Sequence, residues 1–453
     1  MKALYTKYHS HYRENLRLAI PLVISRTGNI LTQVSDSVVI GHFGGIIPLA
    51  GVSLGNSLFI IPLMMGLGVC YGITPLIAQY SGAGRKDKCG KLLINSLLLN
   101  TAAGIILFTV VCAGVVLTLP YLGQSPEVIK QARPFLFIMG VSLIPFMIFN
   151  TFKQFAEGLG FTKQAMKISI WGSILNIVLG IIFVKGLFGI PPMGIRGTGY
   201  STLIERALMA VFMVFYVFRS THFKEYLTKF LWRHIDRRSF HALLRIGLPV
   251  SMQQLFAVSA FAGAGILVGA ISPVAQAAHQ VAMNMASLTY IMASGVAAAA
   301  AIKSGNHFGA GNADLLQRSA ISTYHIVIIF MSFTAIIFAS FNHLLPLMYT
   351  SDQAVVSLAA QLFIIAAIFQ LFDGLQVVGL GILRGMGDVN IPTFINFLAY
   401  WIFGIPIGFV LGIVFHWGAQ GVWCGLTLSL MTASLLLFLR FKRISMKILK
   451  VTY

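Results

Sequence analysis

Three carboxylates stand inside long apolar stretches of this 453-residue sequence: Asp36, Glu205 and Asp373. A charged side chain within hydrocarbon costs several kcal/mol, so it normally faces a partner or a water-filled cavity. In a poorly solvated site a carboxylate can hold a proton. Together with hydroxyl, amide and carbonyl oxygens it can instead bind Na⁺. The chemistry predicted for these residues is therefore the reversible binding of a cation.

Polar and basic neighbours accompany two of these carboxylates. Thr202 lies three residues before Glu205 and shares its helix face, whereas the adjacent Arg206 offers Glu205 a structural ion pair instead. Arg26 lies ten residues before Asp36, about 15 Å along a helix, and is a candidate counter-charge. The residues predicted to line a substrate cavity or to join a polar network are Gln33, Arg26, Glu205, Gln253, Gln254, Gln280, Asn284 and Gln376.

The elements that must position these groups are membrane helices. The chain is 57% hydrophobic and 10% charged, with a mean hydropathy of +0.85, whereas a soluble domain carries about 25% charged residues. Apolar runs of about 20 residues span a bilayer as helices. The predicted spans are 16–41, 46–70, 92–119, 133–157, 166–187, 195–218, 243–268, 275–302, 320–346, 357–383, 391–415 and 419–440. The expected fold is an all-α polytopic membrane protein with twelve transmembrane helices.

The formal net charge of +20 follows the topology of the spans. Lys and Arg gather at the N-terminus, in alternate loops, in the central loop and in the C-terminal tail, whereas loops such as 42–47 and 269–275 carry no charge. Basic loops stay in the cytoplasm, so both termini of this multi-pass membrane protein are predicted to be cytoplasmic. The loop flanked by Lys185 and Arg196 is the exception. Contact with lipid headgroups explains this charge better than nucleic acid does.

The two halves of the sequence resemble each other. Leu16–Pro21 matches Leu244–Pro249 at an offset of 228, and Gly82-Ala83-Gly84 matches Gly309-Ala310-Gly311 at an offset of 227. Six helices in each half give both halves the same orientation, so they form a parallel repeat suited to alternating access. The predicted organisation is an N-lobe of helices 1–6 over 1–218, a basic cytoplasmic linker over 219–241, and a C-lobe of helices 7–12 over 242–453 with the basic tail.

The sequence contains no catalytic constellation. There is no P-loop, GxSxG or HExxH motif, and His279 has no second His, Cys or carboxylate at ligand spacing, so it is expected to pack or to hydrogen-bond. The four cysteines show no CxxC spacing and are expected to be packing residues. The chain is therefore not expected to be an enzyme. Without a nucleotide site, the energy for transport must come from an ion gradient.

Several motifs resemble those of the multidrug and toxic compound extrusion (MATE) family, in its bacterial NorM-like branch. They are Val34–Gly41 in the first span, the duplicated glycine motifs at 82–84 and 309–311, and the pair Gly158-Leu159-Gly160 and Gly385-Met386-Gly387. The resemblance covers nearly the whole chain. It implies a cation-coupled antiporter, driven by H⁺ or Na⁺, that exports organic cations or amphiphilic drugs.

The same resemblance implies a cation site in the N-lobe. Its residues are Asp36, Asn176 of the Leu175-Asn176 pair, Thr202, and Thr198 through its backbone carbonyl. If the ion is Na⁺, Asp36 and Asn176 are its expected ligands. Relatives often carry a second polar residue four positions after the Asn, where this chain has Gly180, so the resemblance does not fix the number of ligands.

The C-lobe resembles the family less completely. Asp373 falls where many relatives carry a tenth-span carboxylate linked to cation coupling, and it is the second acidic candidate. In span seven many relatives carry a Glu where this chain has Ala257, and the nearby Gln253 and Gln254 cannot titrate. We therefore expect coupling in the N-lobe.

Two alternative functions remain open at this point. A lipid-linked oligosaccharide flippase shares the helical plan of the superfamily but usually lines its cavity with several Arg and Lys, whereas these spans offer few beyond Arg26 and Arg206. A membrane-embedded enzyme would need an acid–base or metal cluster. The expected partners are a cationic or amphiphilic small molecule and the lipid bilayer, with no nucleic acid. The chain is expected to be a monomer, with no cofactor apart from the coupling ion.

Overall fold

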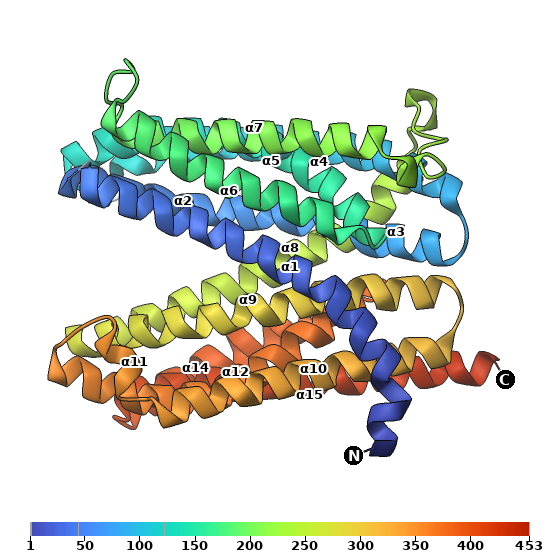
Figure 1. Ribbon diagram of the computed structural model, residues 1–453. Helices are drawn as coiled ribbons and strands as arrows, with labels where there is room; N and C mark the ends of the chain where they lie inside the picture. The colour runs from blue at the N-terminus through green and yellow to red at the C-terminus, as the bar shows by residue number, and fades with distance from the viewer. Residues whose placement is uncertain (1, 44, 122, 453) are drawn as a thin grey trace. The chain divides into compact units, whose positions relative to one another are not determined.

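The computed structural model describes residues 2–43, 45–121 and 123–452, and within these ranges the regular structure is helical throughout, with no β-strand. Figure 1 shows the arrangement of the helices along the chain. The α-helices are α1 (Lys2–Phe43), α2 (Ile46–Cys70), α3 (Ile73–Gly82), α4 (Lys86–Leu117), α5 (Pro126–Gly158), α6 (Thr162–Lys185), α7 (Ile195–Arg219), α8 (Arg237–Gly269), α9 (Pro273–Gly309), α10 (Ala313–Ser340), α11 (Leu344–Leu347), α12 (Gln353–Gly385), α13 (Asn390–Phe397), α14 (Ile405–Phe409) and α15 (Gly418–Thr452).

Eleven helical segments of the described chain are long and apolar enough to cross a membrane. They correspond to the second to twelfth predicted spans, with α2 and α3 joined over Ile47–Gly82 and the segment Asn390–Val414 counted as one. The first predicted span, 16–41, lies within α1, which carries Arg17, Arg26 and Asp36 and is less apolar. The prediction of an all-α polytopic membrane protein with twelve helices is confirmed, although several helices extend beyond their predicted spans.

The chain divides into two compact units. The N-terminal unit contains 24–251, and the C-terminal unit contains 1–23 together with 252–453. Each unit has its own buried apolar clusters, such as that around Phe152 and Phe155 in the N-terminal unit. The short 3₁₀ helices η2 (Thr221–Phe223) and η3 (Trp232–His234) lie in the predicted linker. The lobe boundaries drawn from the sequence stay a prediction.

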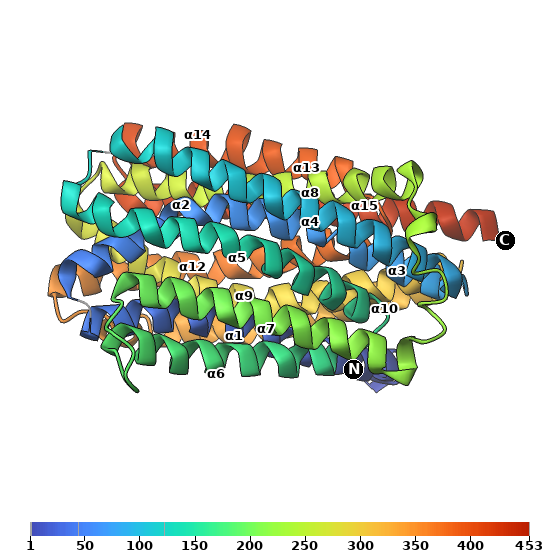
Figure 2. The same cartoon turned by 90° about the horizontal axis from the view of Figure 1, so that it is seen from above.

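Small residues bring α6 and α7 together in the N-terminal unit, where Figures 1 and 2 show them side by side. A Cβ added to Gly172 would lie 2.5 Å from Sδ of Met209, and one added to Gly197 would lie 2.9 Å from the carbonyl carbon of Phe183. Close helix packing of this kind requires residues without bulky side chains. It places Asn176 of α6 opposite Thr202 of α7.

Glycines also set the packing of α9 against α12 in the C-terminal unit. A Cβ on Gly381 would lie 2.3 Å from the carbonyl oxygen of Ala297, and one on Gly385 would lie 2.4 Å from that of Ala301. The next span is interrupted by two π-helical segments, η4 (Leu398–Gly404) and η5 (Val410–Val414). Such segments widen the turn locally and often occur near functional sites.

Candidate functional site

The N-terminal unit buries a chain of polar side chains from three helices. Asp36 of α1 is 9% exposed, Thr202 of α7 is 3% exposed and Asn176 of α6 is fully buried. The hydroxyl of Thr202 donates to Oδ2 of Asp36 at 3.4 Å, and Nδ2 of Asn176 donates to Oγ1 of Thr202 at 3.1 Å. Three of the four residues assigned by resemblance therefore lie in one hydrogen-bonded row, which we call the Asp36 site (Asp36, Asn176 and Thr202).

One hydrogen-bond acceptor of the Asp36 site has no donor among the described residues. Oδ1 of Asn176 is buried and has no hydrogen-bond partner within the described part of the chain. A buried amide oxygen without a partner costs free energy, so a bound cation or a water molecule would satisfy it. The site thus offers carboxylate, hydroxyl and amide oxygens, which are suitable ligands for Na⁺. The carboxylate of Asp36 can alternatively take a proton.

A second carboxylate and a guanidinium lie beside the Asp36 site. Glu205 and Arg206, both buried in α7, are close enough to interact electrostatically with Asp36. The ion pair between Glu205 and Arg206 suggested by their adjacency is not formed within 4.0 Å in the described chain. Arg206 instead donates to Oγ of Ser142 at 2.7 Å and lies 4.6 Å from the ring centre of Phe146. A guanidinium over an aromatic face is stabilised by the ring quadrupole.

The other N-terminal candidates lie outside this row. Thr198 donates to the carbonyl of Ile195 at 2.8 Å, and its own carbonyl accepts from Ser201, so it bonds within the first turn of α7. Arg26 lies 5.7 Å from the ring centre of Tyr71. The side chain of Gln33 lies outside the part of the chain whose side chains are described.

The C-terminal unit holds a separate polar group around α12. Nε2 of Gln376 donates to Oδ1 of Asn396 at 3.0 Å, and the hydroxyl of Tyr400 donates to Oε1 of Gln376 at 2.9 Å. Asp373 is 5% exposed and interacts electrostatically with Tyr400. The amide nitrogen of Gln253 donates to Oγ1 of Thr393 at 2.9 Å, whereas its buried Oε1 has no hydrogen-bond partner among the described residues.

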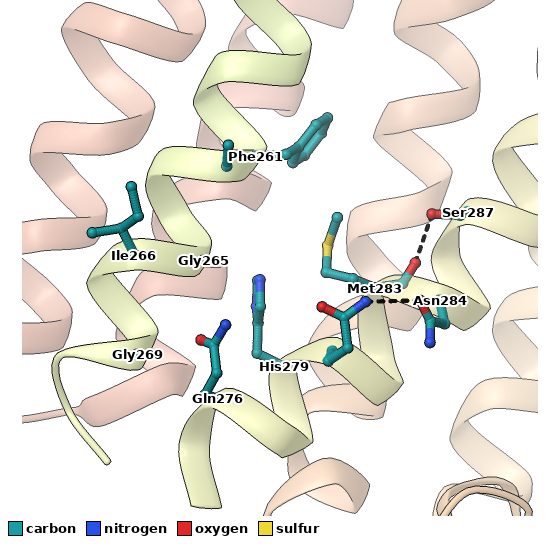
Figure 3. A pocket seen from close by; sticks show the side chains of 11 residues that line it. Phe261, Gly265, Ile266, Gly269, Gln276, His279, Met283, Asn284 and Ser287 are labelled. Atoms are coloured by element: carbon teal, nitrogen blue, oxygen red, sulfur yellow. Dashed lines mark hydrogen bonds between the residues drawn. The ribbon is translucent and has the colours of Figure 1, made fainter. Parts of the chain in front are cut away.

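Two further candidates line a cavity of about 580 Å³ between α8 and α9, which Figure 3 shows from close by. Gln280 and Asn284 lie on α9, where Nε2 of Gln280 donates to Oδ1 of Asn284 at 2.9 Å. Phe261 of α8 and Met283 of α9 give the cavity an apolar side. Gln254 lies on α8 and is half-buried, but it is not part of the cavity lining.

Sequence reasoning missed the partners of these groups. Asn396 and Tyr400 are four positions apart near the start of one span, and this helical spacing could have indicated a shared face. Ser142 and Phe146 also stand four apart, but nothing in the sequence links them to Arg206, which lies 64 positions after Ser142 and 60 after Phe146. Within the described residues no group of three His, Cys, Asp or Glu side chains has the geometry of a metal site.

Comparison with known proteins places the chain in a family. The sequence model of the MatE family matches twice, at residues 21–182 and 249–410, which together make up more than half of the chain. The two matches begin 228 positions apart, the offset found between the two halves of the sequence.

Curated relatives and solved structures agree with this match. The chain is 31% identical over 445 residues to a probable multidrug resistance protein NorM of Xanthomonas campestris, covering 98% of this chain and 96% of that one. It is 29% identical to the multidrug resistance protein MdtK of Pectobacterium atrosepticum, covering 96% of each. The crystal structure of a eukaryotic MATE transporter is similar in fold, with a TM-score of 0.87 at 19% identity over 99% of this chain and 100% of that one. The chain therefore belongs to the MATE family of membrane transporters.

Proposed function

We propose that this protein is a cation-coupled antiporter that exports organic cations or amphiphilic drugs by alternating access, with Asp36 as the coupling residue. The observation that carries the proposal is the Asp36 site: a buried carboxylate bridged through Thr202 to an amide whose oxygen has no partner. The names of the curated relatives, which are multidrug resistance proteins, support drugs as the cargo. We also propose that the protein is a monomer in the bacterial inner membrane, with both termini in the cytoplasm.

The residues of the site have distinct roles in this proposal. Asp36 receives H⁺ on a carboxylate oxygen, or it holds Na⁺ together with Oδ1 of Asn176 and the hydroxyl oxygen of Thr202. Glu205 supplies a second negative charge nearby, and Arg206 limits the total charge of the buried cluster. Because a cation removes charge from a poorly solvated site, it stabilises whichever conformation closes around Asp36. Such differential affinity is what allows a ligand to shift a conformational equilibrium.

The test measures ethidium uptake into everted membrane vesicles of a pump-deficient bacterium, which corresponds to export from the cell, with Na⁺ and proton gradients imposed separately. We expect wild type to export ethidium under one of the two gradients and Asp36→Asn to lose that gradient dependence, because the amide can neither take a proton nor balance a cation. Asp314→Asn, which changes an exposed carboxylate, is the matched control. Uphill export by Asp36→Asn would remove Asp36 from the coupling mechanism.

A second result would redirect the assignment of the cargo. If the inserted wild-type protein moves no ethidium under either gradient, the drug-export proposal fails for this class of cation. A narrower substrate or the lipid-linked oligosaccharide flippase would then be the better proposal, and a lipid-translocation assay would follow.

A further inference from the structure

The cavity between α8 and α9 contains a buried histidine whose tautomer is fixed by its neighbour. His279 is 4% exposed, and its Nδ1 is 3.0 Å from Nε1 of Trp423. Because an indole N–H can only donate a hydrogen bond, Nδ1 of His279 must be the accepting, unprotonated nitrogen. The proton of the neutral imidazole therefore lies on Nε2.

This second nitrogen faces the cavity. Gly265 of α8 lines the cavity, and a Cβ at that position would lie only 3.6 Å from Nε2 of His279. No hydrogen bond to Nε2 is present among the described residues. In Figure 3 the ring stands between Gln276 and Met283 and reaches toward α8. The glycine thus leaves room for a ligand atom at hydrogen-bonding distance from the Nε2–H group.

The other residues that line the cavity also favour an uncharged ligand group that accepts hydrogen bonds. The bond from Gln280 to Oδ1 of Asn284 leaves the Asn284 amide nitrogen as a further donor at the rim. Phe261 and Met283 offer an aromatic face and a polarisable thioether. The described lining contains no Asp, Glu, Lys or Arg, so it provides no counter-charge for the cationic end of a substrate.

We propose that this cavity binds the hydrogen-bond-accepting end of an aromatic amphiphile, a carbonyl or ester oxygen, with His279 as the donor and Trp423 as its positioning residue. The proposal rests on the proposed export of amphiphilic compounds and adds a recognition site for the uncharged part of the molecule. A volume of about 580 Å³ lies within the usual range of small-molecule sites. Trp423 is fully buried and packs edge-on against Phe369 and His279, which holds the indole in place.

The experiment compares two fluorescent aromatic cations bound to the purified protein in detergent, measured by anisotropy. Rhodamine 6G carries an ester carbonyl, whereas ethidium has no oxygen atom. We expect His279→Phe to weaken rhodamine 6G binding about fivefold, the effect of one neutral hydrogen bond, and to leave ethidium binding within about twofold. His279→Gln should retain most rhodamine 6G affinity, because an amide can accept from Trp423 and still donate.

Two more variants separate recognition from structure and from coupling. Trp423→Phe should lower rhodamine 6G affinity less than His279→Phe does, since it frees the tautomer without removing the donor, and Trp171→Phe, at a site 69% exposed, should change nothing. Dye binding in detergent requires no ion gradient and is compared among variants that all keep Asp36, whereas the coupling proposal is tested by the export of Asp36→Asn, so the failure of one proposal is distinguishable from the failure of the other. Equal losses for both dyes in His279→Phe, an unchanged rhodamine 6G affinity, or no rhodamine 6G binding by wild type would each overturn the proposal.

Discussion

At the scale of single residues, Thr202 has the most demanding position in the Asp36 site. Its hydroxyl accepts from Asn176 and donates to Asp36, so one oxygen joins α6, α7 and α1. A hydroxyl can do both at once, whereas an aliphatic side chain of the same shape can do neither. The site therefore depends on the hydroxyl and not on the bulk of Thr202.

Replacing Thr202 by Val should change the apparent affinity for the coupling ion about tenfold, since a hydrogen bond to a charged group is worth about 1.5 kcal/mol. If the ion is H⁺ the affinity should rise, because the hydroxyl stabilises the charged carboxylate of Asp36, and if it is Na⁺ the affinity should fall, because a ligand oxygen is lost. Thr202→Ser keeps the hydroxyl and should stay close to wild type. The measurement is the ion concentration that gives half-maximal ethidium efflux. Thr109→Val removes an exposed hydroxyl that bonds only its own helix and serves as the control. If Thr202→Val and Thr109→Val behave alike, the hydroxyl has no role in ion binding.

At the scale of helices, the start of α8 is fixed to α4 by Asp236. Its Oδ1 accepts from the backbone amide of Ser239 at 2.7 Å, as an N-capping residue does, and its carboxylate is paired with Lys91. The backbone amide of Asp236 also donates to Oδ1 of Asn95 at 3.0 Å. Burial alone would raise the pKa of Asp236, but the hydrogen bonds from Lys91 and Ser239 outweigh it and lower the pKa to about 2.

Asp236→Ala should lower the free energy of unfolding by about 1 kcal/mol, the usual cost of losing an N-cap. Asp236→Asn keeps the cap and loses only the charge pair, so it should cost about half as much. Because the folded pKa is below the ordinary value of 3.8, the advantage of wild type over Asp236→Asn should be complete above about pH 5 and should shrink as the pH falls toward 2. Thermal unfolding in detergent across this range checks both statements. An advantage that grows on acidification would contradict the assigned pairing.

At the scale of the whole molecule, the internal repeat is visible in two equivalent helix crossings. In the N-terminal unit a Cβ on Gly68 would lie 2.4 Å from Cα of Ser251, and in the C-terminal unit a Cβ on Gly295 would lie 2.3 Å from Cγ2 of Val23. Gly68 and Gly295 are 227 positions apart, and Val23 and Ser251 are 228 positions apart. The same close approach is thus built twice from corresponding residues.

Gly68→Ala and Gly295→Ala should therefore have similar effects, each costing about 1–3 kcal/mol through overpacking and each lowering the rate of export. The added methyl group in each variant meets the backbone of a neighbouring helix, so relief requires a shift of the helix itself. Gly114→Ala, where the added carbon meets open space, is the control and should leave stability and export unchanged. If Gly68→Ala or Gly295→Ala were as stable as wild type, the crossing helices would not be held as close together as the structure shows.

The fold could be predicted well because it depends on features that can be read along the sequence. Apolar run length indicated the spans, and the offset of 228 between Leu16–Pro21 and Leu244–Pro249 indicated the repeat, which the two family matches confirm. The Asp36 site could be assembled only through resemblance, since Asn176 and Thr202 are 26 positions apart on different helices. The roles assigned to these residues stay predictions.

The sequence could not predict which of several nearby groups each polar side chain bonds to. Adjacency favoured Glu205 as the partner of Arg206, yet the guanidinium bonds to Ser142 on another helix. The pairing of Gln376 with Asn396 and Tyr400 depends on helix rotation and on the π-helical segment that begins at Leu398, neither of which apolar periodicity encodes. Such contacts follow from three-dimensional packing, where several partners compete within a few ångströms.

The division of the chain into units has a consequence for how such a protein can arise. Residues 1–23 belong to the compact unit built mainly from the second half, and 237–251 of α8 belong to the unit built from the first half. The beginning of the first helix of each half therefore belongs to the unit built mainly from the other half. An ancestral half-length polypeptide with this arrangement would complete its core only by exchanging helix ends with a second copy, as in a domain-swapped homodimer. Two half-chains expressed apart would therefore each lack a segment that its unit contains.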